Sequence, residues 1–241
     1  MSIRIAAAHV FVGDPSAPEL DPADAHHLER VLRLRDGETV TASDGAGRVV
    51  TCRVVRAGKT LELAPDGPVL TERLAQPLVT VAMAPVKGER VEWAVQKLTE
   101  LGVDEIVPLV CRRSVVRWDG ERGERHIERL ARVAREAAMQ CRRAHLPIIG
   151  PVRSVAEALA AAAGAGLAPC AADMGGEPPT LSRPFVLVGP EGGWEEDELP
   201  TDLPRVALAE HVLRTETAAV TAAALLGGLR SGLVVSADPA E

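Results

Sequence analysis

Aromatic side chains are scarce in this sequence of 241 residues, which contains no tyrosine, two phenylalanines and three tryptophans. Few side chains are therefore available to stack against a planar ligand. The four cysteines are widely scattered, without the paired spacing of zinc, iron–sulfur or redox sites. We interpret them as buried or incidental thiols in a reducing compartment, and we predict no metal site. These cysteines are Cys52, Cys111, Cys141 and Cys170.

Long apolar runs are also absent. No stretch approaches the length of a membrane span, and the N-terminus lacks a basic region followed by an apolar segment. We therefore expect a cytoplasmic protein without a membrane anchor. Hydrophobic residues make up 46% of the sequence, enough to fill the core of one large or two small domains.

The formal net charge of −7 is unevenly distributed. Between Cys111 and His145 ten arginines stand against five carboxylates, whereas from Cys170 onward four arginines stand against twelve. A basic sector beside an acidic one remains able to bind RNA. The alternative is a solvated helix whose glutamates and arginines, from Glu121 to Arg132, neutralise one another at i,i+3 and i,i+4 spacing. The arginines outside that block are the better candidates for phosphate contacts: Arg112, Arg113, Arg117, Arg142 and Arg143.

Residues 186–194 read Val-Leu-Val-Gly-Pro-Glu-Gly-Gly-Trp, an apolar strand running into a glycine-rich turn. Glycines have no Cβ and let a small molecule approach the backbone closely. Carboxylates at positions 195–198 would repel a polyphosphate and tolerate a cation, and no dinucleotide or phosphate-loop fingerprint is present. The loop favours an adenosyl ligand with a positive centre, such as S-adenosylmethionine, over ATP or NAD. The alternative is an ordinary strand-to-helix turn with acidic capping.

A second loop, residues 213–217, reads Leu-Arg-Thr-Glu-Thr and opens an alanine-rich helix. We expect Thr215 or Thr217 to cap that helix and Gly227 with Gly228 to end it. Capping explains the threonines, but it does not explain Arg214 at the mouth of the helix.

The remaining pattern predicts two domains. The first 70 residues read as short strands at 38–43, 48–56 and 60–64, with a hairpin at 44–47 and a helix at 21–33 that Asp21 caps. Residues 71–77 read as a linker. Strands then alternate with helices. The strands are predicted at 78–84, 105–110, 184–189 and 204–208, and the helices at 90–101, at 156–166 and in a long segment that ends near residue 143. Such alternation predicts an α/β fold with a mostly parallel sheet covered on both faces.

The motifs at 189–193 and 213–218 resemble those of the 16S ribosomal RNA uridine N3-methyltransferases. These enzymes are a branch of the SPOUT superfamily of knotted, S-adenosylmethionine-dependent methyltransferases. Two positions depart from the family pattern: His211 replaces a common arginine, and Met139 replaces a common glutamate. Further similar segments follow in the family's order over most of the chain: 87–90, 96–97, 100–103, 106–108, 113–114, 140–143 and 146–147.

The resemblance implies a PUA-like, RNA-binding β-barrel over residues 1–72. Over residues 73–241 it implies a SPOUT domain with a trefoil knot that binds the cofactor, catalyses the transfer and dimerises. The implied substrate is 16S rRNA, within the small ribosomal subunit, and the implied homodimer interface includes residues 218–229. Implied cofactor-binding residues are Asp173, Val188, Gly189, Pro190, Glu191, Gly192, Gly193, Leu208, Leu213, Arg214 and Thr215. Implied RNA-binding residues are Arg30, Arg33, Arg35, Lys87, Arg113, Gln140 and Arg143, with Arg48, Arg53 and Arg56 on the same face of the barrel.

Methyl transfer to uridine N3 requires in-line positioning, loss of a weakly acidic proton and stabilisation of the resulting anion. We expect Arg214 to face O2 or O4 of the uracil, and Glu191 or Glu216 to accept the proton. The base must be flipped or unpaired, because N3 of a paired uridine is blocked. Trp118 and Trp194 are candidate stacking side chains, and core packing is the alternative for both.

Two other functions stay open from the sequence. One is a SPOUT methyltransferase that acts on transfer RNA or on another base. The other is an RNA-binding relative that has lost catalysis. The intact loops at 189–193 and 213–217 argue against the second, and the barrel-like extension argues against the first.

Overall fold

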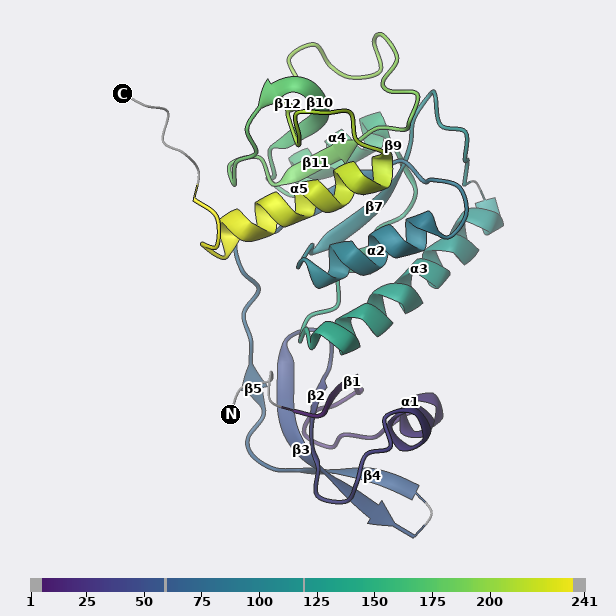
Figure 1. Cartoon of the computed structure of the whole chain (residues 1–241), viewed down its shortest axis with the longest axis vertical. Coiled ribbons are helices and arrows are strands. Elements are labelled where there is room, and N and C mark those ends of the chain that lie inside the picture. The colour runs from purple at the N-terminus through teal and green to yellow at the C-terminus, as the bar shows by residue number, and fades with distance from the viewer. Residues whose placement is uncertain (1–5, 59, 119, 236–241) are drawn as a thin grey trace. The chain divides into compact units, whose positions relative to one another are not determined.

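Figure 1 shows the computed structural model, which describes residues 6–58, 60–118 and 120–235. The chain forms two compact units: Met1–Leu74 with Arg135–Leu146, and Ala75–Ala134 with Pro147–Glu241. That residues 135–146 join the N-terminal unit was not predicted from the sequence. The outer ends of the two predicted domains, 1–5 and 236–241, lie outside the described residues. The roles assigned to the ranges 1–72 and 73–241 stay predictions.

A twisted sheet forms the framework of the first unit (Figure 1). β2 (Thr39–Ser43) pairs antiparallel with β3 (Arg48–Ala57), which pairs antiparallel with β4 (Thr60–Pro65) and β5 (Leu70–Thr71). β1 (Ala8–Phe11) pairs parallel with β2 and was not predicted. The predicted hairpin is confirmed, and Oδ1 of Asp44 accepts the backbone N–H of Ala46 at 2.8 Å and of Arg48 at 3.0 Å.

The helix of this unit starts where the sequence predicted. Oδ1 of Asp21 accepts the backbone N–H of Asp24 at 2.7 Å and caps α1 (Pro22–His26). The helical segment continues as the π-helical turn η2 (His27–Val31) and ends before Arg33. The backbone of Arg33 is left-handed, with a φ of +54°. Asp24 is buried, and NH2 of Arg135 donates to its Oδ2 at 2.6 Å. The last turns of the long helix α3 (Gly120–Cys141) are thereby tied to α1 within the first unit.

A parallel sheet forms the centre of the second unit, in the strand order β12-β10-β11-β6-β7-β8, with β9 also paired to β7. Every described pairing in this sheet is parallel, which confirms the predicted sheet type. Three strands were not predicted: β8 (Ile148–Ile149), β9 (Arg153–Ser154) and β10 (Pro169–Glu177). The predicted strands are β6 (Thr80–Met83), β7 (Glu105–Val110), β11 (Phe185–Val188) and β12 (Arg205–Val206).

Helices pack on both faces of this sheet, as predicted (Figure 1). α2 (Arg90–Glu100), α5 (Thr215–Arg230) and the first part of α3 (Gly120–Cys141) share one buried cluster with Val81 and Val186. α4 (Val155–Gly164) packs in the other cluster with Val107 and Leu187. None of the helices in the described ranges is long and apolar enough to cross a membrane. The trefoil knot stays a prediction.

α5 departs from the sequence prediction at both ends. Its N-cap is Arg214, which makes no side-chain capping bond, and neither threonine caps it. The helix also continues through Gly227 and Gly228 to Arg230. A Cβ at Gly227 would lie 2.8 Å from the carbonyl oxygen of Leu101. This glycine therefore lets α5 approach the end of α2 closely and does not end the helix.

Substituting Gly227 by alanine should lower the free energy of unfolding by about 1–3 kcal/mol, because the new methyl group overpacks the α2–α5 contact. The matched control is Gly164→Ala at the end of α4, where a Cβ would meet no atom within 4 Å. That variant should be neutral or more stable by up to about 1 kcal/mol. Urea denaturation of the two variants measures the difference, and equal stabilities would contradict the packing role of Gly227.

Three of the four cysteines should resist alkylation in the native protein. Burial raises the pKa of Cys52 and Cys170 to about 11, and burial together with the nearby charge of Glu198 raises the pKa of Cys111 to about 12. The thiolate needed for alkylation is therefore scarce at pH 8. Iodoacetamide should modify only the exposed Cys141 within minutes, and all four thiols in denaturant. Mass spectrometry gives the sites, and rapid native labelling of Cys111 would contradict this account.

Candidate active site

A cavity of about 370 Å³ lies where several strands of the parallel sheet end. Because neighbouring strands run in the same direction, the loops after β10, β11 and β12 leave the sheet at one edge. Gly192 and Arg214 do not line this cavity. The other predicted cofactor-binding residues do: Asp173, Val188, Gly189, Pro190, Glu191, Gly193, Leu208, Leu213 and Thr215. The structure thus brings most of them together, and their role stays a prediction.

The Trp194 side chain contacts both the glycine-rich loop and strand β10 of the sheet. A Cβ at Gly189 would lie 2.9 Å from the Trp194 ring, so only glycine permits this contact. The indole Nε1 donates to the carbonyl of Ala172 at 3.3 Å. Trp194 is half-buried and lines the cavity, whereas Trp118 is buried and stacks on His126 with ring centroids 4.4 Å apart. Trp118 therefore packs in the core and does not present a face to a base.

The start of α5 is joined to the glycine-rich loop and to α2. The hydroxyl of Thr215 donates to the carbonyl of Gly189 at 2.9 Å. NH1 of Arg90 donates to Oε1 of the buried Glu216 at 2.9 Å, and NH2 lies 3.7 Å from Oε1 of Glu191. Arg90 was not among the predicted site residues, although it lies in the family-like segment 87–90.

The acidic run after the loop does not open a helix, so the alternative of a strand-to-helix turn with acidic capping is wrong. Residues 196–198 form a turn, and Glu198 accepts the backbone N–H of Arg112 at 2.6 Å and of Glu195 at 3.0 Å. NH1 of Arg113 donates to the carbonyl of Gly192 at 3.1 Å, and its Nε lies 3.6 Å from Glu195. Arg113, expected to contact RNA, therefore already has partners on the glycine-rich loop.

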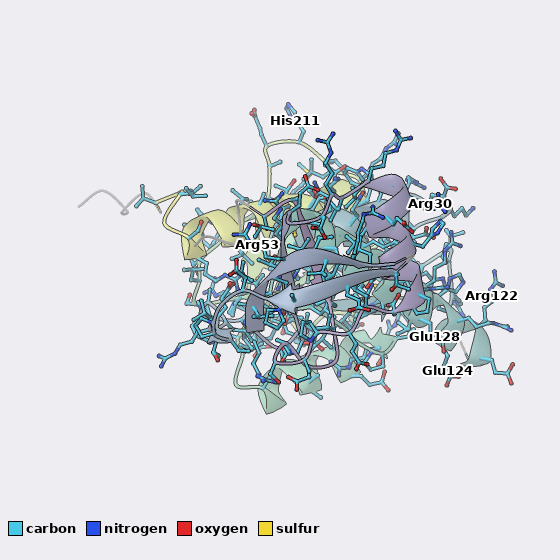
Figure 2. The ribbon with its side chains drawn as sticks, turned by 90° about the horizontal axis from the view of Figure 1, so that it is seen from below. Arg30, Arg53, Arg122, Glu124, Glu128 and His211 are labelled. Atoms are coloured by element: carbon cyan, nitrogen blue, oxygen red, sulfur yellow. The ribbon has the colours of Figure 1, made fainter. Side chains whose placement is uncertain are left out.

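The other predicted RNA contacts divide between the two units. Lys87 is exposed in the second unit, just before α2. In the first unit Arg30 exposes 71% of its side-chain surface and lies at η2 (Figure 2). Arg33 and Arg35 are exposed, as is Gln140, whereas Arg143 is partly buried. Their RNA-binding role stays a prediction.

Three arginines on the strands of the first unit are already paired, which weakens the prediction of an arginine-lined face. Arg48 lies 3.3 Å from Asp14, and Arg53 donates to Asp66 at 2.7 Å. Arg56 lies 3.3 Å from Glu29 and donates to the carbonyl of Leu34. On this unit the exposed arginines at and after η2, Arg30, Arg33 and Arg35, remain candidates for RNA contacts.

The charged side chains of α3 do not form the expected pairs along the helix. Within the described part of the chain, Arg129 forms its ion pair with Glu92 of α2, at 2.8 Å, and not with a side chain of α3. Arg122, Glu124 and Glu128 project away from the helix (Figure 2). These three side chains are therefore solvated, as the alternative interpretation predicted. The pairs at i,i+3 and i,i+4 spacing that it also predicted are not formed among the described residues of α3.

The two departures from the family pattern occupy different environments. His211 is exposed on the loop after β12, where it lines the cavity and extends away from the rest of the chain (Figure 2). Met139 is partly buried against the core of the first unit, 3.4 Å from NH1 of Arg135. Among the described residues, no cluster of three His, Cys, Asp or Glu side chains could hold a metal ion.

Comparisons with known proteins match both parts of the chain. Residues 73–227 match the RNA methyltransferase domain family, and residues 20–63 match the RNA methyltransferase PUA domain. A ribosomal RNA small subunit methyltransferase E from Mycobacterium bovis is 35% identical over 242 residues, covering 92% of this chain and 90% of that protein. The protein of the same name from Bacillus subtilis is 27% identical, covering 81% and 83%.

Solved structures agree with this assignment. A probable rRNA methyltransferase from Porphyromonas gingivalis is 26% identical with a TM-score of 0.78, covering 94% of this chain and 100% of its own. The ribosomal RNA small subunit methyltransferase E from Neisseria gonorrhoeae, bound to S-adenosyl methionine, is 27% identical with a TM-score of 0.74, covering 92% and 97%. The predicted fold class, a SPOUT-type parallel α/β sheet preceded by a PUA-like domain, is thereby confirmed. The chain belongs to the RNA methyltransferase family that includes the ribosomal RNA small subunit methyltransferases E.

Proposed function

We propose that this chain transfers a methyl group from S-adenosylmethionine to N3 of one uridine in 16S rRNA. The observation that carries the proposal is the cavity that the glycine-rich loop and the loop before α5 line together. Relatives over nearly the whole length are named for methylation of small-subunit ribosomal RNA. The proposal includes a cytoplasmic location, as expected from the sequence.

The cavity fits the cofactor in size, backbone access and charge. Its volume of about 370 Å³ lies in the range of small-molecule sites. Gly193, where a Cβ would meet no atom within 4 Å, leaves the backbone open to a close ligand, and Asp173 and Glu191 provide negative charge that suits a sulfonium. When bound there, S-adenosylmethionine supplies an activated methyl group.

Arg214 is suited to stabilise the uracil anion. It stands at the N-cap of α5, exposed, and its guanidinium forms no hydrogen bond or ion pair with another described residue. A fixed cation at this position would favour the charge that develops on O2 or O4 as N3 loses its proton. Glu191 or Glu216, both within reach of Arg90, would take that proton.

The proposal includes a homodimer and a trefoil knot, as the family resemblance implies. Ala219, Ala222 and Ala223 of α5 are buried within the second unit. A partner subunit would therefore meet the opposite side of the helix, which exposes Thr217 and Ala224. A SPOUT enzyme for transfer RNA and a non-catalytic RNA-binding protein are the competing functions.

The direct test is to incubate the protein with radiolabelled S-adenosylmethionine and undermethylated small ribosomal subunits. We expect label in 16S rRNA at one site, recovered as N3-methyluridine after nuclease digestion and mass spectrometry. Free 16S rRNA and transfer RNA serve as parallel substrates. Label in transfer RNA would favour the first competing function, and cofactor binding without transfer would favour the second.

The Arg214→Ala variant should lower the single-turnover rate by about 10²-fold or more, because it removes a charge that acts mainly in the transition state. Its affinity for S-adenosylhomocysteine, measured by calorimetry, should change little. Arg183→Ala, at the other end of β11 from the glycine-rich loop, is the matched control and should keep the wild-type rate. Full turnover of Arg214→Ala would refute the proposed role of this arginine.

A further inference from the structure

Glu191 and Glu216, the two candidate proton acceptors, share one arginine. Arg90 opens α2, and its guanidinium lies 2.9 Å from Glu216 and 3.7 Å from Glu191. Its Nε donates to the carbonyl of Lys87 at 3.4 Å, which restrains the side chain on its own loop. Arg90 therefore joins the start of α2, the glycine-rich loop and the start of α5.

The two carboxylates differ in access. Glu216 exposes 7% of its side-chain surface, and its Oε2 is buried with no hydrogen-bond partner among the described residues. Glu191 exposes 46% of its side-chain surface and lines the cavity. An oxygen closed to solvent is closed to an incoming base as well. A uridine that approaches the cofactor cavity can therefore meet Glu191, which is exposed, but not the buried Glu216.

A buried carboxylate is costly to keep unless its partner is well placed. Here the charge of Glu216 has a use, because it fixes the direction of the Arg90 guanidinium. The arrangement has the logic of catalytic triads, in which a third group orients the residue that acts on the reacting group. We infer that Arg90 is a positioning residue: Glu216 orients it, and it holds Glu191 in place as the proton acceptor for uridine N3. The inference rests on the proposed function and divides its roles between the two carboxylates.

The proton transfer and the methyl transfer need no reactant other than the uridine, S-adenosylmethionine and the residues named above. The N3–H bond breaks, and the proton passes to a carboxylate oxygen of Glu191. The N3 electron pair forms the new bond to the methyl carbon, while the carbon–sulfur bonding pair stays on sulfur as a neutral thioether. Glu191 then releases the proton to water. Arg90 stabilises the anionic carboxylate that is needed again for the next turnover.

The test compares single-turnover rates across pH for Arg90→Ala, Arg90→Lys, Glu191→Gln and Glu216→Gln. We expect Glu191→Gln to lose about 10²-fold or more, as for removal of a general base, and Glu216→Gln to lose no more than about tenfold. Removing the positive charge in Arg90→Ala should lower the rate and move the acid limb of the pH–rate profile to higher pH. Arg90→Lys keeps the charge and should keep the acid limb near its wild-type position.

Arg129→Ala is the matched control, because it also removes an arginine that pairs with a glutamate, but Glu92 of α2 is its partner. It should leave rate and pH profile unchanged. Calorimetry with S-adenosylhomocysteine should give the same affinity for Arg90→Ala as for wild type, within about twofold. A purely structural role would instead lower affinity and thermal stability without moving the acid limb, and would overturn the inference.

Two further outcomes decide the assignment. Should Arg90→Ala fail to fold because Glu216 is left unpaired, the Arg90→Ala/Glu216→Gln double variant removes both charges and provides the same pH test. An equal loss in Glu216→Gln and Glu191→Gln would overturn the division of roles. Wild-type protein that forms no N3-methyluridine would refute the proposed function itself, whereas active wild type with an unaffected Arg90→Ala would refute only this inference.

Discussion

Parallel strand pairing fixes where each loop of the candidate site begins, and the rest of the site depends on it. β11 pairs with β6 so that Val188 lies opposite Met83, and the backbone N–H of Ala84 donates to the carbonyl of Val188. The chain segment that leads to Arg90 and the one that leads to Glu191 thus leave the sheet side by side. A slip of β11 by one residue would turn its buried side chains to the opposite face. It would also move the carbonyl of Gly189 away from the Thr215 hydroxyl, which donates a hydrogen bond to it in the observed register.

Ion pairs and small residues then hold α5 along the sheet, from that edge at its start to the opposite edge at its end. At its start Glu216 meets Arg90, and at its end Arg230 donates to the carboxylate of Asp104 and to the carbonyl of Pro77. Between them Gly227 permits contact with the end of α2. Because both ends are tied, the backbone position of Arg214 is set by the helix, while its guanidinium forms no hydrogen bond or ion pair with another described residue. Its hydrogen-bonding capacity is therefore available to a developing anion.

Local signals predicted much of this fold, and long-range contacts account for the differences. β7 was predicted at the residues where it occurs, and Asp21 caps α1 as its sequence position indicated. β10 escaped prediction because Pro169–Glu177 contains no β-branched or aromatic residue, and its extended form depends on pairing with strands on both sides. Thr215 does not cap α5 because it is the first residue of the helix, after the N-cap Arg214, and its hydroxyl instead donates to a carbonyl 26 positions away. The motifs predicted which loops line the cavity, but no sequence pattern could predict the pairing of Arg90 with Glu216, which are 126 positions apart.

The same long-range pairing changes how the charge of the chain is interpreted. In the basic sector Arg113 contacts the glycine-rich loop, Arg129 pairs with Glu92, and Arg135 pairs with the buried Asp24. These three arginines of the basic sector therefore interact within the protein. They do not contribute to a continuous basic surface for a phosphate backbone. Affinity from counterion release should then be modest, because it scales with the number of phosphates that free cations neutralise. Selection of one uridine must depend correspondingly more on the shape of the cavity and on the few cations, such as Arg214 and Lys87, that stay exposed beside its loops.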